Sequence, residues 1–218
     1  GTETKHYMTT ISALFFGFIS AVIGIFPPGL INMTAAKVKI KEGKRAAVWF
    51  VIGAVLIIII QVYLAILFAQ FIGEHPQVVV LLREIGCGIF TLLTVYFLAI
   101  AKTPQKIKGK IKKQRTSTRF FLGMLLSALN FFPIPYYVLV SLSLASFGFF
   151  VFEPLSIFIF VLGAVLGSFL VFYTYISFFT KIENKTDFFM KNMNKIIGSI
   201  TGIIAVVTLF NIINYYWN

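Results

Sequence analysis

The chain has 218 residues, of which 59% are hydrophobic and 12% are charged, and its mean hydropathy is +0.93. A soluble protein of this length has too small a core to bury so much apolar surface. The composition therefore excludes a soluble globular domain and indicates an integral membrane protein. The formal net charge is +12, and the single cysteine, Cys87, excludes an internal disulfide and a redox relay between two cysteines of the chain.

Six apolar runs follow one another along the chain, and each exceeds the roughly 20 residues that a helix needs to cross a bilayer. They cover residues 9–36, 46–72, 78–101, 120–150, 155–180 and 196–217. Their continuous hydrophobicity predicts helices, because barrel strands alternate apolar and polar residues over only about 10 positions. We predict a single transmembrane domain over residues 1–218 with short connectors. Because the first run lacks a cationic start, no cleavable signal peptide is predicted.

Prolines interrupt the first and fourth runs, as Pro27-Pro28-Gly29 and as Pro133-Ile134-Pro135. Each proline removes a backbone N–H and clashes with the carbonyl one turn earlier, so both helices are predicted to break at these positions. Unpaired backbone groups are tolerated at membrane depth only where they are buried in protein or line a wet cavity. Interrupted helices at corresponding positions of two halves therefore indicate a transporter with a substrate site near the middle of the membrane.

The basic residues predict the orientation of the six spans. Of the 19 Lys and Arg, all except Lys5 and Arg83 lie in the first, third and fifth connectors. The positive-inside rule places these connectors in the cytoplasm and both termini outside. Residues 102–119 hold the largest group of positive charges and are predicted to contact anionic lipid. The alternative, a nucleic-acid site, lacks the interleaved aromatic residues and the fold that such a site needs.

A cut after the third span divides the chain into two repeats of three spans, residues 9–101 and residues 120–217, joined by the basic cytoplasmic loop 102–119. Because three is odd, the second repeat enters the membrane from the opposite face, which makes the repeat inverted. The openings of the halves are weakly alike, with Phe15-Phe16-Gly17 in one and Phe120 to Gly123 in the other. The predicted fold is an all-α integral membrane protein of six transmembrane helices. The alternative is that two unrelated helices are both kinked by proline, which is common in membranes.

The run from Gly24 to Met33 reads GIFPPGLINM and is followed by a basic stretch that ends Glu42-Gly43-Lys44-Arg45. Together with Leu82 to Gly86, and with Phe121 to Asn130 before Pro133, this pattern resembles the lysine-exporter (LysE/RhtB-type) amino-acid efflux proteins over nearly the whole chain. The resemblance implies a secondary transporter in the bacterial cytoplasmic (inner) membrane that exports an amino acid or a similar small zwitterionic metabolite. It also implies proton antiport and alternating access around the two broken helices.

The chain departs from the family pattern at several positions. The usual break reads Pro-Gly-Pro, whereas here Leu30 follows Pro28-Gly29. Two Phe residues separate Asn130 from Pro133, and the acidic residue often found in the second span has no counterpart except the polar Gln61. These departures indicate a divergent branch, and they concern substrate and coupling more than fold.

The half-helix that begins near Gly29 is predicted to bind a substrate carboxylate, because its first N–H groups and its dipole attract negative charge. The carbonyls of residues 23–26, freed by the prolines, can accept hydrogen bonds from an ammonium group or hold a cation. Three amide side chains and a tyrosine lie near the two breaks. The predicted substrate-binding residues are Pro27, Pro28, Gly29, Asn32, Gln61, Asn130, Pro133, Pro135 and Tyr136. The alternative for each polar side chain is a hydrogen bond that joins two helices.

Glu84 is the acidic residue best placed to lie inside a span, which makes it the candidate for proton coupling. The alternative places Arg83 and Glu84 at the outer interface, as paired or snorkelling groups. The chain has two His, and its spans hold no cluster of carboxylates, so neither a metal site nor a cofactor is predicted.

Small residues spaced by four in the last two runs predict close helix contacts, within the chain or in a homodimer. They are Gly163 and Gly167 in the fifth run and Gly198 and Gly202 in the sixth. Two alternatives to amino-acid export remain: an exporter or channel for ions or metals with a related fold, and, in poorer agreement with the sequence, a membrane-embedded enzyme. A hydrolase needs a nucleophile with a base, and no His lies inside a predicted span.

Overall fold

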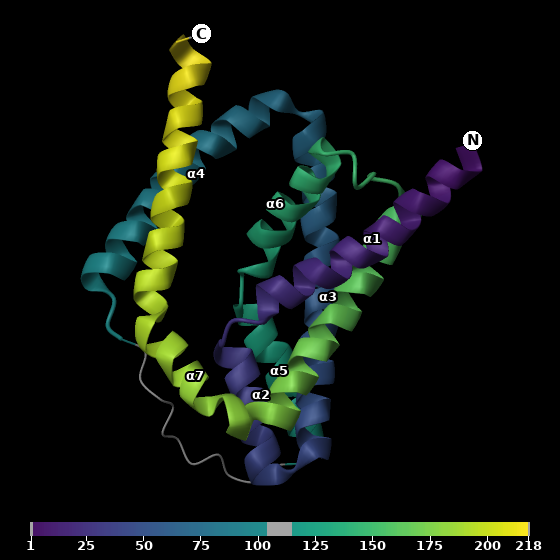
Figure 1. Cartoon of the computed structure of the whole chain (residues 1–218), viewed down its shortest axis with the longest axis vertical. Coiled ribbons are helices and arrows are strands. Elements are labelled where there is room, and N and C mark those ends of the chain that lie inside the picture. Colours follow the sequence, from purple (N-terminus) through teal and green to yellow (C-terminus); the bar gives the residue numbers. More distant parts are fainter. Residues whose placement is uncertain (1, 104–114, 218) are drawn as a thin grey trace. The chain divides into compact units, whose positions relative to one another are not determined.

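The computed structural model describes residues 2–103 and 115–217, and of residues 2–9, 180 and 182–186 it describes the backbone alone. These residues form helices and no strand. In chain order the helices are α1 (Thr2–Ile25), α2 (Leu30–Glu42), α3 (Lys44–Glu74), α4 (Pro76–Val95), the π-helical turn η1 (Tyr96–Ile100), α5 (Thr116–Leu129), α6 (Pro133–Ser146) and α7 (Pro154–Trp217) (Figure 1). The chain divides into unit 1, residues 1–71 and 109–182, and unit 2, residues 72–108 and 183–218.

Two pairs of helices in unit 1 are bent sharply where the prolines predict breaks (Figure 1). The bend between α1 and α2 is 78°, and the bend between α5 and α6 is 62°. Pro27 and Pro28 lie between α1 and α2, whereas Pro133 is the first residue of α6. A proline in the first turn lacks an N–H that the helix would leave unpaired in any case, so it starts a helix easily. Both predicted breaks are confirmed, and the second lies at residues 130–132, directly before its prolines.

Four helical segments of the described chain are long and apolar enough to cross a membrane by themselves. They are Lys44–Glu74, Pro76–Ile100, Pro154–Phe179 and Asp187–Trp217. Each bent pair adds one span if its two helices are counted together, which raises the number to six.

The last two predicted spans are joined by helix. α7 continues through residues 181–195, where the sequence predicted a connector between two separate helices. This stretch contains no Pro or Gly, and Lys, Glu and Met are good helix formers, so nothing in it ends the helix. The prediction of separate helices is therefore wrong at this point, although both segments of α7 remain long enough to cross a membrane.

Two close helix pairs hold unit 1 together, and the first of them joins α1 to the beginning of α7. A Cβ atom added to Gly17 would lie 2.2 Å from the carbonyl oxygen of Phe160. One added to Gly163 would lie 2.2 Å from the carbonyl oxygen of Leu14. The backbones touch, so only glycine fits at these two positions. The contact predicted for Gly163 is confirmed within the chain.

The second close pair joins α3 to α5 with the same geometry. A Cβ atom on Gly53 would lie 2.0 Å from the Phe120 carbonyl oxygen, and one on Gly123 would lie 1.9 Å from that of Phe50. In both pairs, each glycine faces the carbonyl of the residue three positions before the partner glycine. Small residues allow this approach between membrane helices, which is stabilised by close van der Waals contact.

Unit 2 consists of α4, η1 and the last part of α7. The hydroxyls of Thr94 and Thr201 form a hydrogen bond of 3.0 Å between α4 and α7. A Cβ atom on Gly198 would lie 2.5 Å from the Leu98 side chain, and Gly202 faces Thr94 at 3.2 Å. The close contacts predicted for these two glycines are confirmed. None of the residues of α4, all of which are described, is buried.

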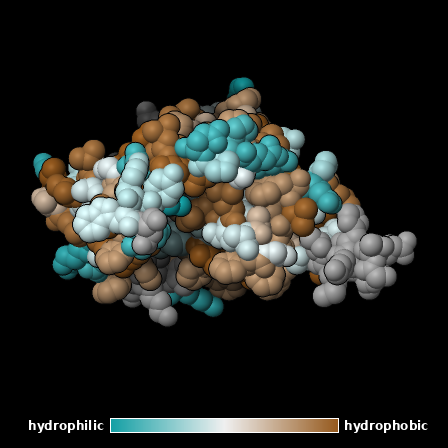
Figure 2. Space-filling model, turned by 90° about the horizontal axis from the view of Figure 1, so that it is seen from above, coloured by the Kyte–Doolittle hydropathy of each residue, from teal (hydrophilic) through white to brown (hydrophobic). Residues whose placement is uncertain are grey.

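Large hydrophobic side chains remain exposed on many of the helices. Figure 2 shows a face on which brown, hydrophobic residues reach the surface beside teal, hydrophilic ones. Leu92 and Phe158 belong to this class and are exposed to 72% and 64%. Such apolar surface suits helices whose surroundings are lipid.

Candidate substrate site at the two helix breaks

The first break leaves the N-terminus of α2 without a side-chain cap. α2 begins at Leu30, and its N-cap is Gly29, whose backbone is extended (φ −141°, ψ 179°). As a glycine, Gly29 has no side chain that could accept a hydrogen bond from the first N–H groups of α2. Free N–H groups and the positive end of the helix dipole attract anions. The second half-helix thus begins where the sequence predicted, and its N-terminus has the chemistry of a carboxylate site.

Side chains of unit 1 hold several carbonyls of the first break. Asn32, only 4% exposed, donates from Nδ2 to the carbonyl oxygens of Ile25 at 2.6 Å and Pro27 at 3.1 Å. The Tyr175 hydroxyl donates to the Phe26 carbonyl oxygen at 2.7 Å. These bonds satisfy backbone groups that the break would otherwise leave unpaired. Asn32 thus joins the two half-helices to each other.

The carbonyls of residues 23–26 were predicted to accept hydrogen bonds from a substrate, and two of them already accept hydrogen bonds within the protein. The carbonyls of Ile25 and Phe26 already accept hydrogen bonds from side chains of the chain. The carbonyls of residues 23 and 24 have no helical donor, because the residues four positions later are Pro27 and Pro28. The carbonyls of residues 23 and 24 are therefore the better candidates for the predicted contact with a substrate.

The second break is held by Gln61 of α3, which is buried. Its Nε2 donates to the carbonyl oxygens of Ser127 at 3.1 Å and Asn130 at 2.9 Å. Asn130 Oδ1 in turn accepts a hydrogen bond of 3.3 Å from the backbone N–H of Phe132. Gln61 therefore does at the second break what Asn32 and Tyr175 do at the first.

Three buried side-chain oxygens in the described part of unit 1 have no hydrogen-bond partner: Gln61 Oε1, Ser127 Oγ and Tyr137 Oη. The three residues are exposed to 6%, 1% and 3%, respectively. An unsatisfied polar group in such surroundings costs roughly 1–3 kcal/mol, so each one needs an explanation. Ser127 was not among the predicted site residues. The sequence could have suggested Ser127 as a site residue, because its hydroxyl lies one turn before the second break.

Tyr136 brings the two breaks next to each other. Its hydroxyl donates to the Ser20 carbonyl oxygen of α1 at 2.6 Å. Its ring lies on the backbone of Gly24, where an added Cβ atom would be 2.8 Å from ring atom Cε1. The ring also stacks on Phe132, with 5.3 Å between the centroids. The residue that follows the second break therefore contacts the helix that ends at the first.

Glu84 lies on α4 in unit 2, where its side chain is exposed and accepts a hydrogen bond from the Tyr216 hydroxyl. Tyr216 belongs to the aromatic group at the end of α7. This contact lies within unit 2, whereas all the other predicted site residues belong to unit 1.

A buried ion pair links α2 to α5 in unit 1. Arg119 Nε donates to Glu42 Oε2 at 2.9 Å, and a second guanidinium nitrogen bonds Oε1. The two side chains are exposed to 7% and 2%. From the sequence, Arg119 was counted among the basic residues of the cytoplasmic loop that orient the protein in the membrane, and this ion pair was not predicted. The available signal was the single acidic residue of the basic first connector.

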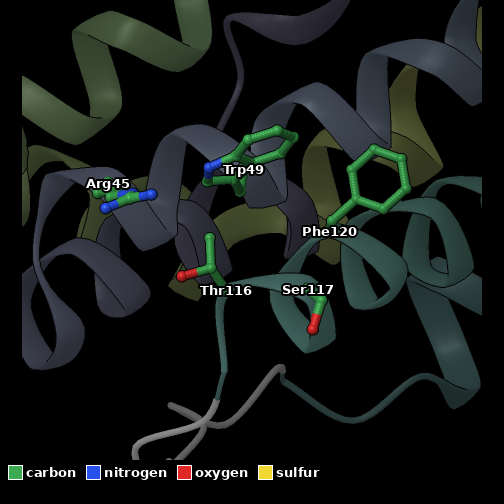
Figure 3. A pocket seen from close by; sticks show the side chains of 5 residues that line it. All are labelled: Arg45, Trp49, Thr116, Ser117 and Phe120. Carbon is green, nitrogen blue, oxygen red and sulfur yellow. The ribbon is translucent and has the colours of Figure 1, made fainter.

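A cavity of about 270 Å³ opens at the beginning of α5, and Figure 3 shows the side chains that line it. It is lined by Arg45 and Trp49 of α3 and by Thr116, Ser117 and Phe120 of α5. The Trp49 and Phe120 rings meet edge to face, with 6.1 Å between their centroids. None of the predicted site residues lines this cavity, because Asn130 follows the opposite end of α5.

Apolar helices long enough to span a membrane, together with two breaks that lie side by side, define a multi-span helical membrane protein. Among the described residues, no three His, Cys, Asp or Glu side chains gather where they could hold a metal ion. The family model described as LysE type translocator matches residues 22–211, and the chain belongs to this family. Membership makes it a transporter of amino acids or related compounds and not an enzyme. No curated protein sequence and no solved structure matches the chain.

Proposed function

We propose that this protein exports an amino acid or a similar small zwitterionic metabolite across the bacterial cytoplasmic membrane, and that the substrate binds at the two breaks. The observation that carries the proposal is the contact of Tyr136 with Ser20 and Gly24, which brings the two breaks together. The uncapped N-terminus of α2 favours a carboxylate, and the C-terminus of α5 favours a positive charge. A zwitterionic amino acid has both groups, a carboxylate for the N-terminus of α2 and an ammonium group for the C-terminus of α5.

The matching glycine contacts support an inverted repeat. The broken span of each repeat packs on the middle span of the other, α1 on α7 and α5 on α3, through the same reciprocal approach. Repeats over residues 9–101 and 120–217 account for this likeness, since an inverted pair places equivalent helices in equivalent contacts. Alternating access by relative movement around the breaks is part of the proposal. Proton antiport, with Glu84 as the coupling group, is part of the proposal.

The positive-inside rule places both termini outside and the end of unit 1 that carries the Arg119 to Glu42 pair in the cytoplasm. Anionic lipid is the expected partner of the basic loop 102–119, of which residues 104–114 lie outside the described part of the chain. Charge attraction near the bilayer surface supports this contact.

The experiment that tests the proposal measures efflux of labelled amino acids from preloaded proteoliposomes, with and without a pH gradient. The variant Pro27→Ala with Pro28→Ala should insert normally and lose export, because a continuous helix removes the break. Pro154→Ala is the matched control, since Pro154 begins a helix away from both breaks. Unchanged export by the double variant would exclude the breaks as the site. If no amino acid is exported, and ions are, the alternative of an ion exporter with this fold replaces the proposal.

A further inference from the structure

We propose that the C-terminal end of α5 binds a monovalent cation, with Gln61 Oε1 and Ser127 Oγ among its ligands. Two sources share this chemistry: an alkali-metal ion, and the ammonium group of the substrate. If the bound cation is the substrate's ammonium group, the proposal rests on the proposed function; if it is an alkali-metal ion, the proposal is independent of that function.

The first support is the orientation of the Gln61 amide. Its nitrogen donates to two carbonyl oxygens, those of Ser127 and Asn130, so a flipped amide would place oxygen against oxygen. Oε1 must therefore point away from these carbonyls. It is buried and has no donor among the described residues. A buried acceptor without a donor is suited to a cation.

The second support is Ser127, whose hydroxyl differs from those of Ser141 and Ser168, two other buried serines in unit 1. Ser141 donates to the Tyr137 carbonyl at 2.6 Å, and Ser168 donates to the Ala164 carbonyl at 2.7 Å, each one turn back along its helix. Ser127 Oγ makes no such bond and is 1% exposed. Its oxygen lone pairs are therefore available. Because Gln61 bonds the backbone of Ser127, the two unpaired oxygens belong to residues in direct contact.

The third support is the helix end itself. The carbonyl of Leu129 has no helical donor, because the residue four positions later is Pro133. The last carbonyls of a helix carry partial negative charge, and interrupted membrane helices use such ends to coordinate Na⁺. The groups that meet here are neutral oxygens. Divalent ions are usually held by carboxylates, so these ligands favour a singly charged cation.

The test uses the purified full-length protein in detergent micelles. Thermal unfolding is followed by intrinsic fluorescence in sodium, lithium, potassium, methylammonium and choline chloride at one ionic strength. At least one of the small cations is expected to raise the unfolding midpoint by about 2 °C or more over choline chloride. A response to alkali ions alone identifies a metal-ion site, a response to methylammonium alone identifies an ammonium subsite, and a response to both identifies a shared site.

Ser127→Ala is expected to abolish most of this cation effect. In choline chloride it should be as stable as the wild type or more stable, because it removes an unpaired buried hydroxyl. Ser127→Thr keeps the oxygen and should keep the effect, and so should Ser141→Ala, the matched control. Equal midpoints in all five salts, as expected if water or nothing binds there, would overturn the proposal. A full cation effect in Ser127→Ala would do the same. Amino-acid efflux is measured separately, so a protein that responds to cations but exports no amino acid rejects only the proposed function.

Discussion

Arg119 and Glu42 form a bidentate ion pair whose side chains are almost completely buried. Glu42 is the last residue of α2, and Arg119 lies in the first turn of α5, so the pair ties one broken span to the other. Desolvation of two charges costs free energy, and their mutual attraction offsets this cost only while both are present.

Glu42→Gln is expected to lower the free energy of unfolding by about 3–5 kcal/mol, because the buried Arg119 then loses the carboxylate of its bidentate pair. Arg115→Gln, at an exposed position just before α5, is the control and should change stability little. The double variant Glu42→Gln with Arg119→Gln should recover much of the loss. Chemical unfolding of the wild type, Glu42→Gln, Arg119→Gln and the double variant measures the coupling. A double variant less stable than Glu42→Gln would contradict the pairing.

Gly123→Ala is expected to destabilise unit 1 by roughly 1–3 kcal/mol. The new methyl group would lie 1.9 Å from the Phe50 carbonyl oxygen, which cannot move away unless α3 and α5 separate. Gly88→Ala is the control, because nothing lies within 4 Å of a Cβ atom at that position. Alanine is the better helix former, so the control should be as stable as the wild type or slightly more stable. Similar thermal midpoints for the two variants would show that the close approach contributes little.

Asn32→Asp is expected to destabilise the protein more than Asn32→Ala does. Alanine leaves the Ile25 and Pro27 carbonyls without their donor, at a cost of roughly 1–3 kcal/mol. Aspartate adds repulsion, because an oxygen then faces both carbonyls. Asn192→Asp serves as the control, since Asn192 donates to the Phe188 carbonyl at 2.9 Å in an exposed place where water can replace the bond. If alanine proves the more harmful substitution at position 32, the donor role assigned to Asn32 is wrong.

Glu84→Gln is expected to abolish the acceleration of efflux by a pH gradient, because an amide cannot take up and release a proton. Tyr216→Phe removes the hydrogen bond to Glu84 but keeps the carboxylate, so efflux should still respond to the gradient. Glu74→Gln replaces another exposed acidic residue of unit 2 and is the control. Proteoliposome efflux over a range of imposed gradients measures all three variants. A full gradient response in Glu84→Gln assigns the coupling to another group.

The breaks could be predicted from the sequence because proline acts locally: it removes an N–H from its own residue and excludes the turn before it. The partners of the freed carbonyls could not. Tyr175 reaches Phe26 across 149 positions and Gln61 reaches Ser127 across 66, and such pairings depend on tertiary packing. The burial of Arg119 also depends on tertiary packing and could not be predicted, because a count of charges places this residue at the cytoplasmic surface.

The continuity of α7 was also missed, for a different reason. Basic residues at 181–195 report on which side of the membrane a segment lies, and this signal is independent of whether the segment is helical. Helix propensity, with no Pro or Gly present, was the better guide to the local structure. For Gly163, in contrast, spacing alone was sufficient, because a small residue at each turn leaves a groove for a neighbouring backbone.

The two glycine pairs also decide which parts of unit 1 can move as rigid bodies. Where backbone touches backbone, a helix cannot slide without collision, so α1 travels with the first part of α7 and α5 travels with α3. Each body takes one helix from before the loop 102–119 and one from after it. Under the proposed alternating access, we expect unit 1 to open between these two bodies. A chain severed in the loop would have no complete body in either fragment, so the two fragments are expected to work only when they are produced together.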